Sequence, residues 1–170
     1  PAVFPDFTRA ATRAWWGTLY KDLLADGVAG FWNDMNEPAI FETPSKTMPL
    51  ETVHRIDSDD FAPREARHAE VHNVYGMENA RATHEGLLKL QPNTRPFVMT
   101  RAAYAGAQRY AVTWTGDNSS SPEHLRLSVQ QLLNLGLSGM AWSGADVGGF
   151  IGGASPELLT RWIAIGAFTP

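Results

Sequence analysis

Hydrophobic residues recur at helical spacing in four stretches of the chain and run without polar alternation in four shorter ones. Spacing of three to four residues indicates one buried helix face, whereas a short continuous apolar run is typical of a strand covered on both faces. The pattern predicts helices over residues 12–25, 66–90, 122–136 and 158–166. It predicts buried strands over residues 28–32, 96–100, 110–114 and 138–143.

Local signals mark the ends of some of these elements. Ser121-Pro122 and Ser155-Pro156 precede the last two helices, and serine at the N-cap followed by proline in the first turn favours a helix start. The stretch from about Glu42 to Arg64 differs, because it holds three prolines and a cluster of acids. We predict that it forms a long inserted surface loop, a feature that is usually functional or mobile.

The order of these elements predicts a parallel α/β sheet. Asp34, Arg101, Asp117 and Asp146 each come just after a predicted strand, which is where a (β/α)8 TIM barrel keeps its active site. A closed barrel typically needs about 250 residues. We therefore expect residues 1–170 to be the central part of a catalytic barrel domain with several strands missing, a fragment that is inactive and poorly soluble on its own.

Composition excludes several classes of partner. Fourteen Lys and Arg residues against eighteen Asp and Glu residues give a net charge of −4, and no basic stripe points to nucleic acid. No apolar run approaches the roughly 20 residues of a membrane span. The absence of cysteine excludes disulfides and thiolate metal sites and suits a reducing compartment, so a cytoplasmic location is favoured.

Two acids at strand ends are the strongest chemical signal. The segment from Trp32 to Glu37 runs from a buried strand into two carboxylates and two amides, and Trp114-Thr115-Gly116-Asp117 repeats the design. Each acid taken alone has a structural alternative, as a strand-end cap or a helix-entry residue. Two carboxylates facing one pocket are, however, what cleavage of a glycosidic bond needs, one as nucleophile and one as acid and then base.

The chain resembles glycoside hydrolase family 31, and most of all its bacterial α-glucosidases. Four motifs carry the resemblance in order along the chain: Trp32–Glu37, Thr100-Arg101, Trp114–Asn118 and Gly144–Phe150. The resemblance implies a retaining α-glycosidase on a (β/α)8 barrel that removes terminal α-linked glucose by double displacement, without metal or cofactor. It also implies an oligosaccharide or α-glucoside substrate, and a longer protein with the rest of the barrel and flanking β domains.

The same resemblance implies a role for each candidate residue. Asp34 matches the nucleophile and Asp117 the general acid/base. Trp32, Met35 and Trp114 match walls of the sugar pocket, Arg101 matches a ligand of sugar hydroxyls, Asp146 matches an acid that orders the site, and Glu37 matches a residue supporting the nucleophile's loop. In a retaining enzyme the two catalytic carboxyl groups should lie roughly 5 to 6 Å apart.

Two alternatives of function stay open. The same acids would serve an α-xylosidase, an α-galactosidase, a transglycosylase or an α-glucan lyase. A non-catalytic sugar-binding relative would be expected to lose one of the two aspartates, and this sequence keeps both. The pair His68 and His72 lacks the H-E-x-x-H pattern of a metal site, and we interpret both as solvated helix residues.

Overall fold

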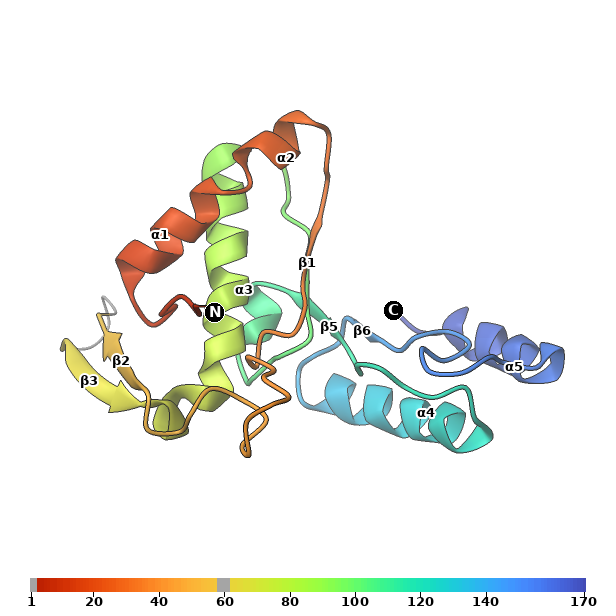
Figure 1. The fold of residues 1–170 in the computed structure, drawn as a ribbon. Helices are drawn as coiled ribbons and strands as arrows, with labels where there is room; N and C mark the ends of the chain where they lie inside the picture. The colour runs from red at the N-terminus through yellow and green to blue at the C-terminus, as the bar shows by residue number, and fades with distance from the viewer. Residues whose placement is uncertain (1–2, 58–61) are drawn as a thin grey trace. The chain divides into compact units, whose positions relative to one another are not determined.

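The computed structural model describes residues 3–57 and 62–170, and the chain divides into two compact units, Pro1–Ala111 and Val112–Pro170 (Figure 1). The first, unit 1, carries helices α1 (Ala10–Thr18), α2 (Lys21–Ala25) and α3 (His68–Leu90). It also carries strands β1 (Phe31–Asn33), β2 (Val53–Ile56), β3 (Arg64–Arg67) and β4 (Val98–Thr100) and the 3-10 turn η1 (Ala107–Arg109). The second, unit 2, holds β5 (Val112–Trp114), α4 (Pro122–Leu137), β6 (Ser143–Gly144) and α5 (Pro156–Gly166).

The long helix α3 is the scaffold of unit 1, and α1 lies along it (Figure 1). The two helices approach to backbone contact at Gly17 and Gly86, because a Cβ on Gly86 would lie only 2.3 Å from the Cα of Gly17. Aromatic and aliphatic side chains from α3, from α1 and from the residues that flank α1 fill the space around this crossing: Phe7, Trp16, Tyr20, Tyr75, Ala82 and Leu87. The single helix expected over residues 12–25 is broken between α1 and α2, so that prediction was wrong at Leu19 and Tyr20.

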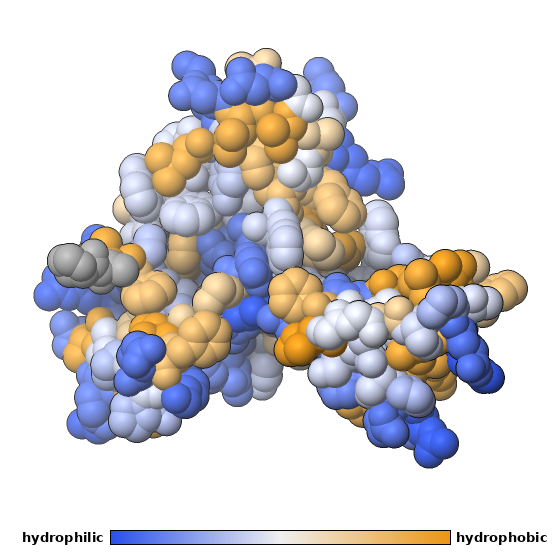
Figure 2. All heavy atoms as spheres, turned by 45° about the vertical axis from the view of Figure 1, so that its right-hand side comes forward, coloured by the Kyte–Doolittle hydropathy of each residue, from blue (hydrophilic) through white to orange (hydrophobic). Residues whose placement is uncertain are grey.

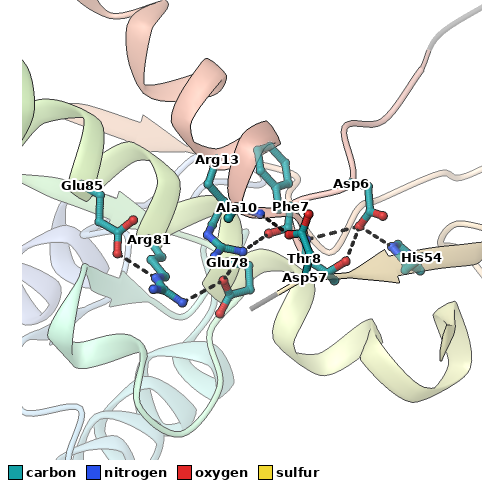
Figure 3. A network of polar contacts seen from close by, with 10 residues as sticks. All are labelled: Asp6, Phe7, Thr8, Ala10, Arg13, His54, Asp57, Glu78, Arg81 and Glu85. Atoms are coloured by element: carbon teal, nitrogen blue, oxygen red, sulfur yellow. Dashed lines mark hydrogen bonds and ion pairs between the residues drawn. The ribbon is translucent and has the colours of Figure 1, made fainter. Parts of the chain in front are cut away.

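A charged ladder also joins α1 to α3 (Figure 3). Arg13 is buried, donates to the carbonyl of Phe7 at 2.8 Å and lies 3.3 Å from a carboxylate oxygen of Glu78. Arg81 continues the ladder from Glu78 to Glu85, whose oxygen accepts from Nε at 2.8 Å. Burial raises the pKa of Glu78, and the two arginines oppose that rise. The ladder fixes α1 and the residue Phe7 before it against α3.

Parallel strand pairs confirm the predicted α/β class. In unit 1, β1 pairs with β4 in the register Phe31↔Val98 and Asn33↔Thr100. The residues after both strands, Asp34 and Arg101, therefore leave the pair at the same end. In unit 2, β5 pairs with β6 in the same parallel sense.

The segment from Glu42 to Arg64 is not simply a loop. Within its described residues, strand β2 covers Val53–Ile56 and pairs antiparallel with β3. Strand β3 takes in Arg64, the end of the predicted loop, and Ala66 and Arg67, which the sequence had assigned to the start of a helix. His54 is the buried position of β2 and Ala66 that of β3. Residues 58–61, also part of the predicted loop, lie outside the described residues.

A chain of hydrogen bonds explains why His54 is buried. Its Nδ1 lies 3.0 Å from the carboxylate of Asp6 (Figure 3), and its Nε2 lies 3.0 Å from Nδ1 of His68. Nε2 of His68 in turn lies 3.2 Å from Nδ1 of His72 and 3.3 Å from the hydroxyl of Thr47. Because the carboxylate accepts from His54, each neutral ring along the chain donates through Nδ1 and accepts through Nε2. The prediction that His68 is a solvated helix residue was wrong, since its side chain is fully buried.

We expect the protein to lose stability as the pH falls from about 6.5 to 4. Burial, and then the charges of His54 and His72, lower the pKa of His68 from 6.5 to about 4. Between these values the unfolded chain binds a proton that the folded chain does not, so acid favours unfolding, by about 3 kcal/mol at the lower limit. Thermal unfolding of the full-length protein across this range should show the loss, and His68→Asn should flatten it. An equal slope in that variant would contradict the assignment.

Unit 2 follows its sequence signals closely at the helix starts. The hydroxyl oxygens of Ser121 and Ser155 accept from the amides of His124 and Leu158, both at 3.2 Å, so both predicted N-caps are confirmed. The predicted strand over residues 138–143 was wrong except at its last residue, because β6 covers only Ser143–Gly144.

Large apolar side chains remain on the surface of the chain, where Figure 2 shows them as orange patches. On α4 they form a stripe at helical spacing, with Val129, Leu133 and Leu137 all exposed. A stripe of this kind is a surface made for packing against further protein. Among the described residues, no helix has both the length and the apolar character needed to cross a bilayer.

Candidate active site

Asp34 is the first residue after β1, and its carboxylate is held from two sides. Its Oδ1 accepts from the amide of Met35 at 2.9 Å and lies 3.4 Å from Nη1 of Arg101. Met35 has φ +54°, in the left-handed region that a non-glycine residue adopts at a cost. The chain thus turns sharply behind the carboxylate, which keeps 38% of its side chain exposed. An anchored, solvent-reachable carboxylate fits the role of a nucleophile.

Arg101 connects Asp34 to Glu37. Its Nε and Nη2 donate to the two oxygens of Glu37 at 2.8 and 3.0 Å, a bidentate pair that fixes the plane of the guanidinium. The remaining Nη1 is the group that faces Asp34. The structure therefore places Glu37, Arg101 and Asp34 in one cluster, with Glu37 acting on Asp34 through the arginine.

The apolar residues at this strand end are open to approach. The side chain of Trp32 is 56% exposed and that of Met35 is 39% exposed. An exposed indole next to an anchored carboxylate is suited to packing against the apolar face of a sugar ring. In unit 2 the corresponding aromatic, Trp114, is buried at the end of β5.

Asp117 and Asp146 lie together in unit 2. Asp117 is exposed and follows β5 through Gly116, whose φ of +78° supplies the turn. Asp146 follows β6 and is partly buried. Burial, and then the negative charge of Asp117, raise the pKa of Asp146. Two interacting carboxyl groups with one of them biased towards the neutral form are a common arrangement at sites of proton transfer.

Asn118 fastens the loop of Asp117 to the loop of Asp146. Its Nδ2 donates to the carbonyl of Asp146 at 3.2 Å, and its Oδ1 accepts from the amide of Phe150 at 3.0 Å. Gly149 lies so close to Ser120 that a Cβ would approach the Ser120 amide to 2.4 Å. The glycines of this stretch thus allow two backbones to meet.

Asn36 has the corresponding place in unit 1. It is buried, lies two residues after Asp34, and donates to the hydroxyl of Thr100 at 2.8 Å while accepting from the amide of Ala102 at 3.0 Å. Sequence reasoning missed both asparagines as functional candidates. The signal that was available is their position directly beside the acids, since a buried amide needs partners on both its donor and acceptor sides.

No group of three or more His, Cys, Asp or Glu side chains that could hold a metal ion occurs within residues 3–57 and 62–170. Asp34 and Glu37 instead pair with Arg101 in unit 1, and in unit 2 burial and the charge of Asp117 raise the pKa of Asp146.

The whole chain, residues 1–170, matches the family described as the glycosyl hydrolases family 31 TIM-barrel domain. The chain belongs to glycoside hydrolase family 31. It is therefore part of a TIM-barrel domain, and the expected fold is confirmed.

Named relatives agree with the family assignment. Alpha-glucosidase 2 of Bacillus thermoamyloliquefaciens is 49% identical over 169 residues, which is 99% of this chain and 21% of that protein. The crystal structure of a family 31 alpha-glucosidase from Bacteroides thetaiotaomicron has a TM-score of 0.82 at 48% identity and covers 98% of this chain and 25% of that one. A glucosidase II alpha subunit bound to Glc1Man2 has a TM-score of 0.84 at 40% identity, over 97% and 18% of the two chains. This chain of family 31 thus spans about a fifth of the length of the curated relatives it matches.

Proposed function

We propose that the protein containing this chain is a retaining α-glycosidase that hydrolyses terminal α-linked glucose from oligosaccharides. The observation that carries the proposal is the anchored carboxylate of Asp34, which Arg101 and the amide of Met35 hold at the end of β1 while leaving it exposed. The names of the family 31 relatives, alpha-glucosidases in bacteria and animals, support the choice of substrate.

In the proposed mechanism Asp34 attacks the anomeric carbon and forms a covalent glycosyl ester. Asp117 gives its proton to the leaving glycosidic oxygen as the old bond breaks. It then takes a proton from water, whose oxygen displaces Asp34 and restores the α configuration. Direct attack requires the two carboxyl groups to lie about 5 to 5.5 Å apart, and this separation stays a prediction.

The remaining residues have supporting roles in this proposal. Arg101 offers donors towards sugar hydroxyls and steadies the charge of Asp34, Glu37 orients Arg101, and Asp146 orders the site beside Asp117. Trp32, Met35 and Trp114 form walls around the terminal sugar. The rest of the barrel and the flanking domains would complete the pocket, and the cytoplasmic location stays a prediction.

The stereochemistry of the first product tests the proposal. Full-length protein is incubated with an aryl α-glucoside, and proton NMR follows the anomeric signal before mutarotation. We expect α-glucose to form first. If β-glucose forms first, the enzyme inverts the configuration and the retaining mechanism is wrong. If no hydrolysis occurs, the proposed glycosidase activity is wrong. If an α-xyloside is turned over faster than the α-glucoside, the proposed specificity for glucose is wrong.

A further inference from the structure

We propose that Asn36 is a positioning residue, which holds the residues on both sides of Arg101, Thr100 through its hydroxyl and Ala102 through its amide, and so sets the placement of the arginine against Asp34. The inference rests on the proposed function, because Asp34 and Arg101 gain their roles there. The hydrogen bonds of the Asn36 side chain go to Gly76, Asn79, Thr100 and Ala102, and not to the carboxylates of Asp34 or Glu37.

Asn36 binds the residues on both sides of Arg101. The Asn36 side chain donates from Nδ2 to Oγ1 of Thr100 at 2.8 Å and accepts at Oδ1 from the amide of Ala102 at 3.0 Å. These two partners are the neighbours of Arg101 in the sequence. The amide of Arg101 is itself bound to the carbonyl of Asn33 at 3.1 Å, directly before Asp34. The last residue of β4 and the two residues after it are thus tied to the segment that carries the proposed nucleophile.

The same amide is tied to α3. Nδ2 of Asn36 lies 3.2 Å from the carbonyl of Gly76 and 3.1 Å from Oδ1 of Asn79. With Thr100, Nδ2 of Asn36 has three acceptors but only two hydrogens, so one hydrogen is shared between two acceptors and both hydrogens are used. Gly76 allows this approach, since a Cβ there would lie 2.4 Å from the Cβ of Ala102 and 2.9 Å from the carbonyl of Asn36. The rigid helix therefore acts as a platform for both loops.

The geometry that this clamp controls is demanding. Arg101 holds Glu37 with two donors and faces Asp34 with the third nitrogen at 3.4 Å. A displacement of about 1 Å at a reacting group can cost about 100-fold in rate. Loss of the clamp should therefore lower the turnover number without removing any group that contacts the sugar.

The test is Asn36→Ala in the full-length protein, assayed with an aryl α-glucoside and corrected for the folded fraction. We expect kcat to fall about 100-fold and KM to change by less than about threefold. Thr100→Val, which keeps the shape of the side chain and removes one partner of the amide, should lower kcat about tenfold and covers the case in which Asn36→Ala does not fold.

Thr83→Val is the matched control. Like Asn36, Thr83 is a buried polar residue, but it lies on α3 and bonds to the carbonyl of Asn79 at 3.1 Å and to the hydroxyl of Tyr20 at 2.9 Å, away from the loops of Asp34 and Arg101. It should lose a comparable amount of thermal stability while its kcat stays within about threefold. Equal losses of kcat in Thr83→Val and Asn36→Ala would reduce Asn36 to a structural residue and overturn the proposal.

Two further measurements separate positioning from general destabilisation. On an Arg101→Ala background, Asn36→Ala should cost far less than it does alone, because the residue acts largely through the arginine; full additivity would contradict this. A crystal structure of full-length Asn36→Ala should show Nη1 of Arg101 displaced from Oδ1 of Asp34. That displacement can be observed even if the wild-type protein proves inactive on α-glucosides, so failure of the proposed function and failure of the clamp are distinguishable. An unchanged Arg101–Asp34 contact would overturn the clamp.

Discussion

Asp34→Ala in the full-length protein should lower kcat/KM for every α-glucoside by about 10⁴-fold or more. The reason is that each substrate, whatever its leaving group, needs the same carboxylate to form the covalent intermediate. Mass spectrometry of wild-type protein quenched during turnover should show an added glucosyl group on the peptide that contains Asp34. The variant should show none.

The product that Asp34→Ala forms in the presence of added azide is a second test of the nucleophile. Without the carboxylate, azide can attack the anomeric carbon from the vacated side, so Asp34→Ala should slowly form the β-glucosyl azide. Asp22→Ala is the control, because Asp22 is an exposed carboxylate on α2, and it should retain wild-type rates. An Asp34→Ala protein that still forms the ester would assign the nucleophile to another residue.

Asp117→Ala should instead discriminate between leaving groups. From a glucoside with a strongly acidic phenol, the leaving group departs as phenolate without being protonated. Formation of the covalent intermediate should therefore slow by less than about tenfold. A disaccharide, whose leaving alcohol must be protonated, should react about 10² to 10⁴ times more slowly. A plot of kcat/KM against the pKa of the leaving group should accordingly become much steeper in the variant than in the wild type.

The product formed with azide distinguishes the two aspartates. In Asp117→Ala the covalent intermediate still forms, and azide needs no general base to open it, so the α-glucosyl azide is expected. Equal losses on activated and natural substrates, or a β-azide from this variant, would show that Asp117 is not the acid/base. Asp146, which lies close enough to Asp117 for its pKa to be raised, would then be the next residue to replace.

Local signals predicted the parts of the fold that local forces determine. The Ser-Pro starts of α4 and α5 are confirmed because a serine cap satisfies amides within its own first turn. The hairpin of β2 and β3 was missed because the buried residue of β2 is His54, whose partners Asp6 and His68 lie far along the chain. A histidine in an acidic, proline-containing stretch carries no local signal of burial.

The candidate site shows the same division. The family motifs pointed to Asp34, Glu37 and Arg101, and the structure brings these three together in unit 1. The motifs did not show that Arg101 has two donors committed to Glu37, nor that Asn36 is surrounded by partners. Such contacts depend on the register of β1 with β4 and on the close approach of α3 at Gly76, which become apparent only in three dimensions.

The buried asparagine beside each acid has a practical consequence for protein engineering. Libraries that randomise whole motifs to change sugar preference would include Asn36 and Asn118, where nearly every replacement leaves buried partners without a hydrogen bond. Most members of such a library would be lost before selection begins. Restricting diversity to the exposed side chains of Trp32 and Met35 would leave those hydrogen bonds intact while reshaping the surface proposed to meet the substrate.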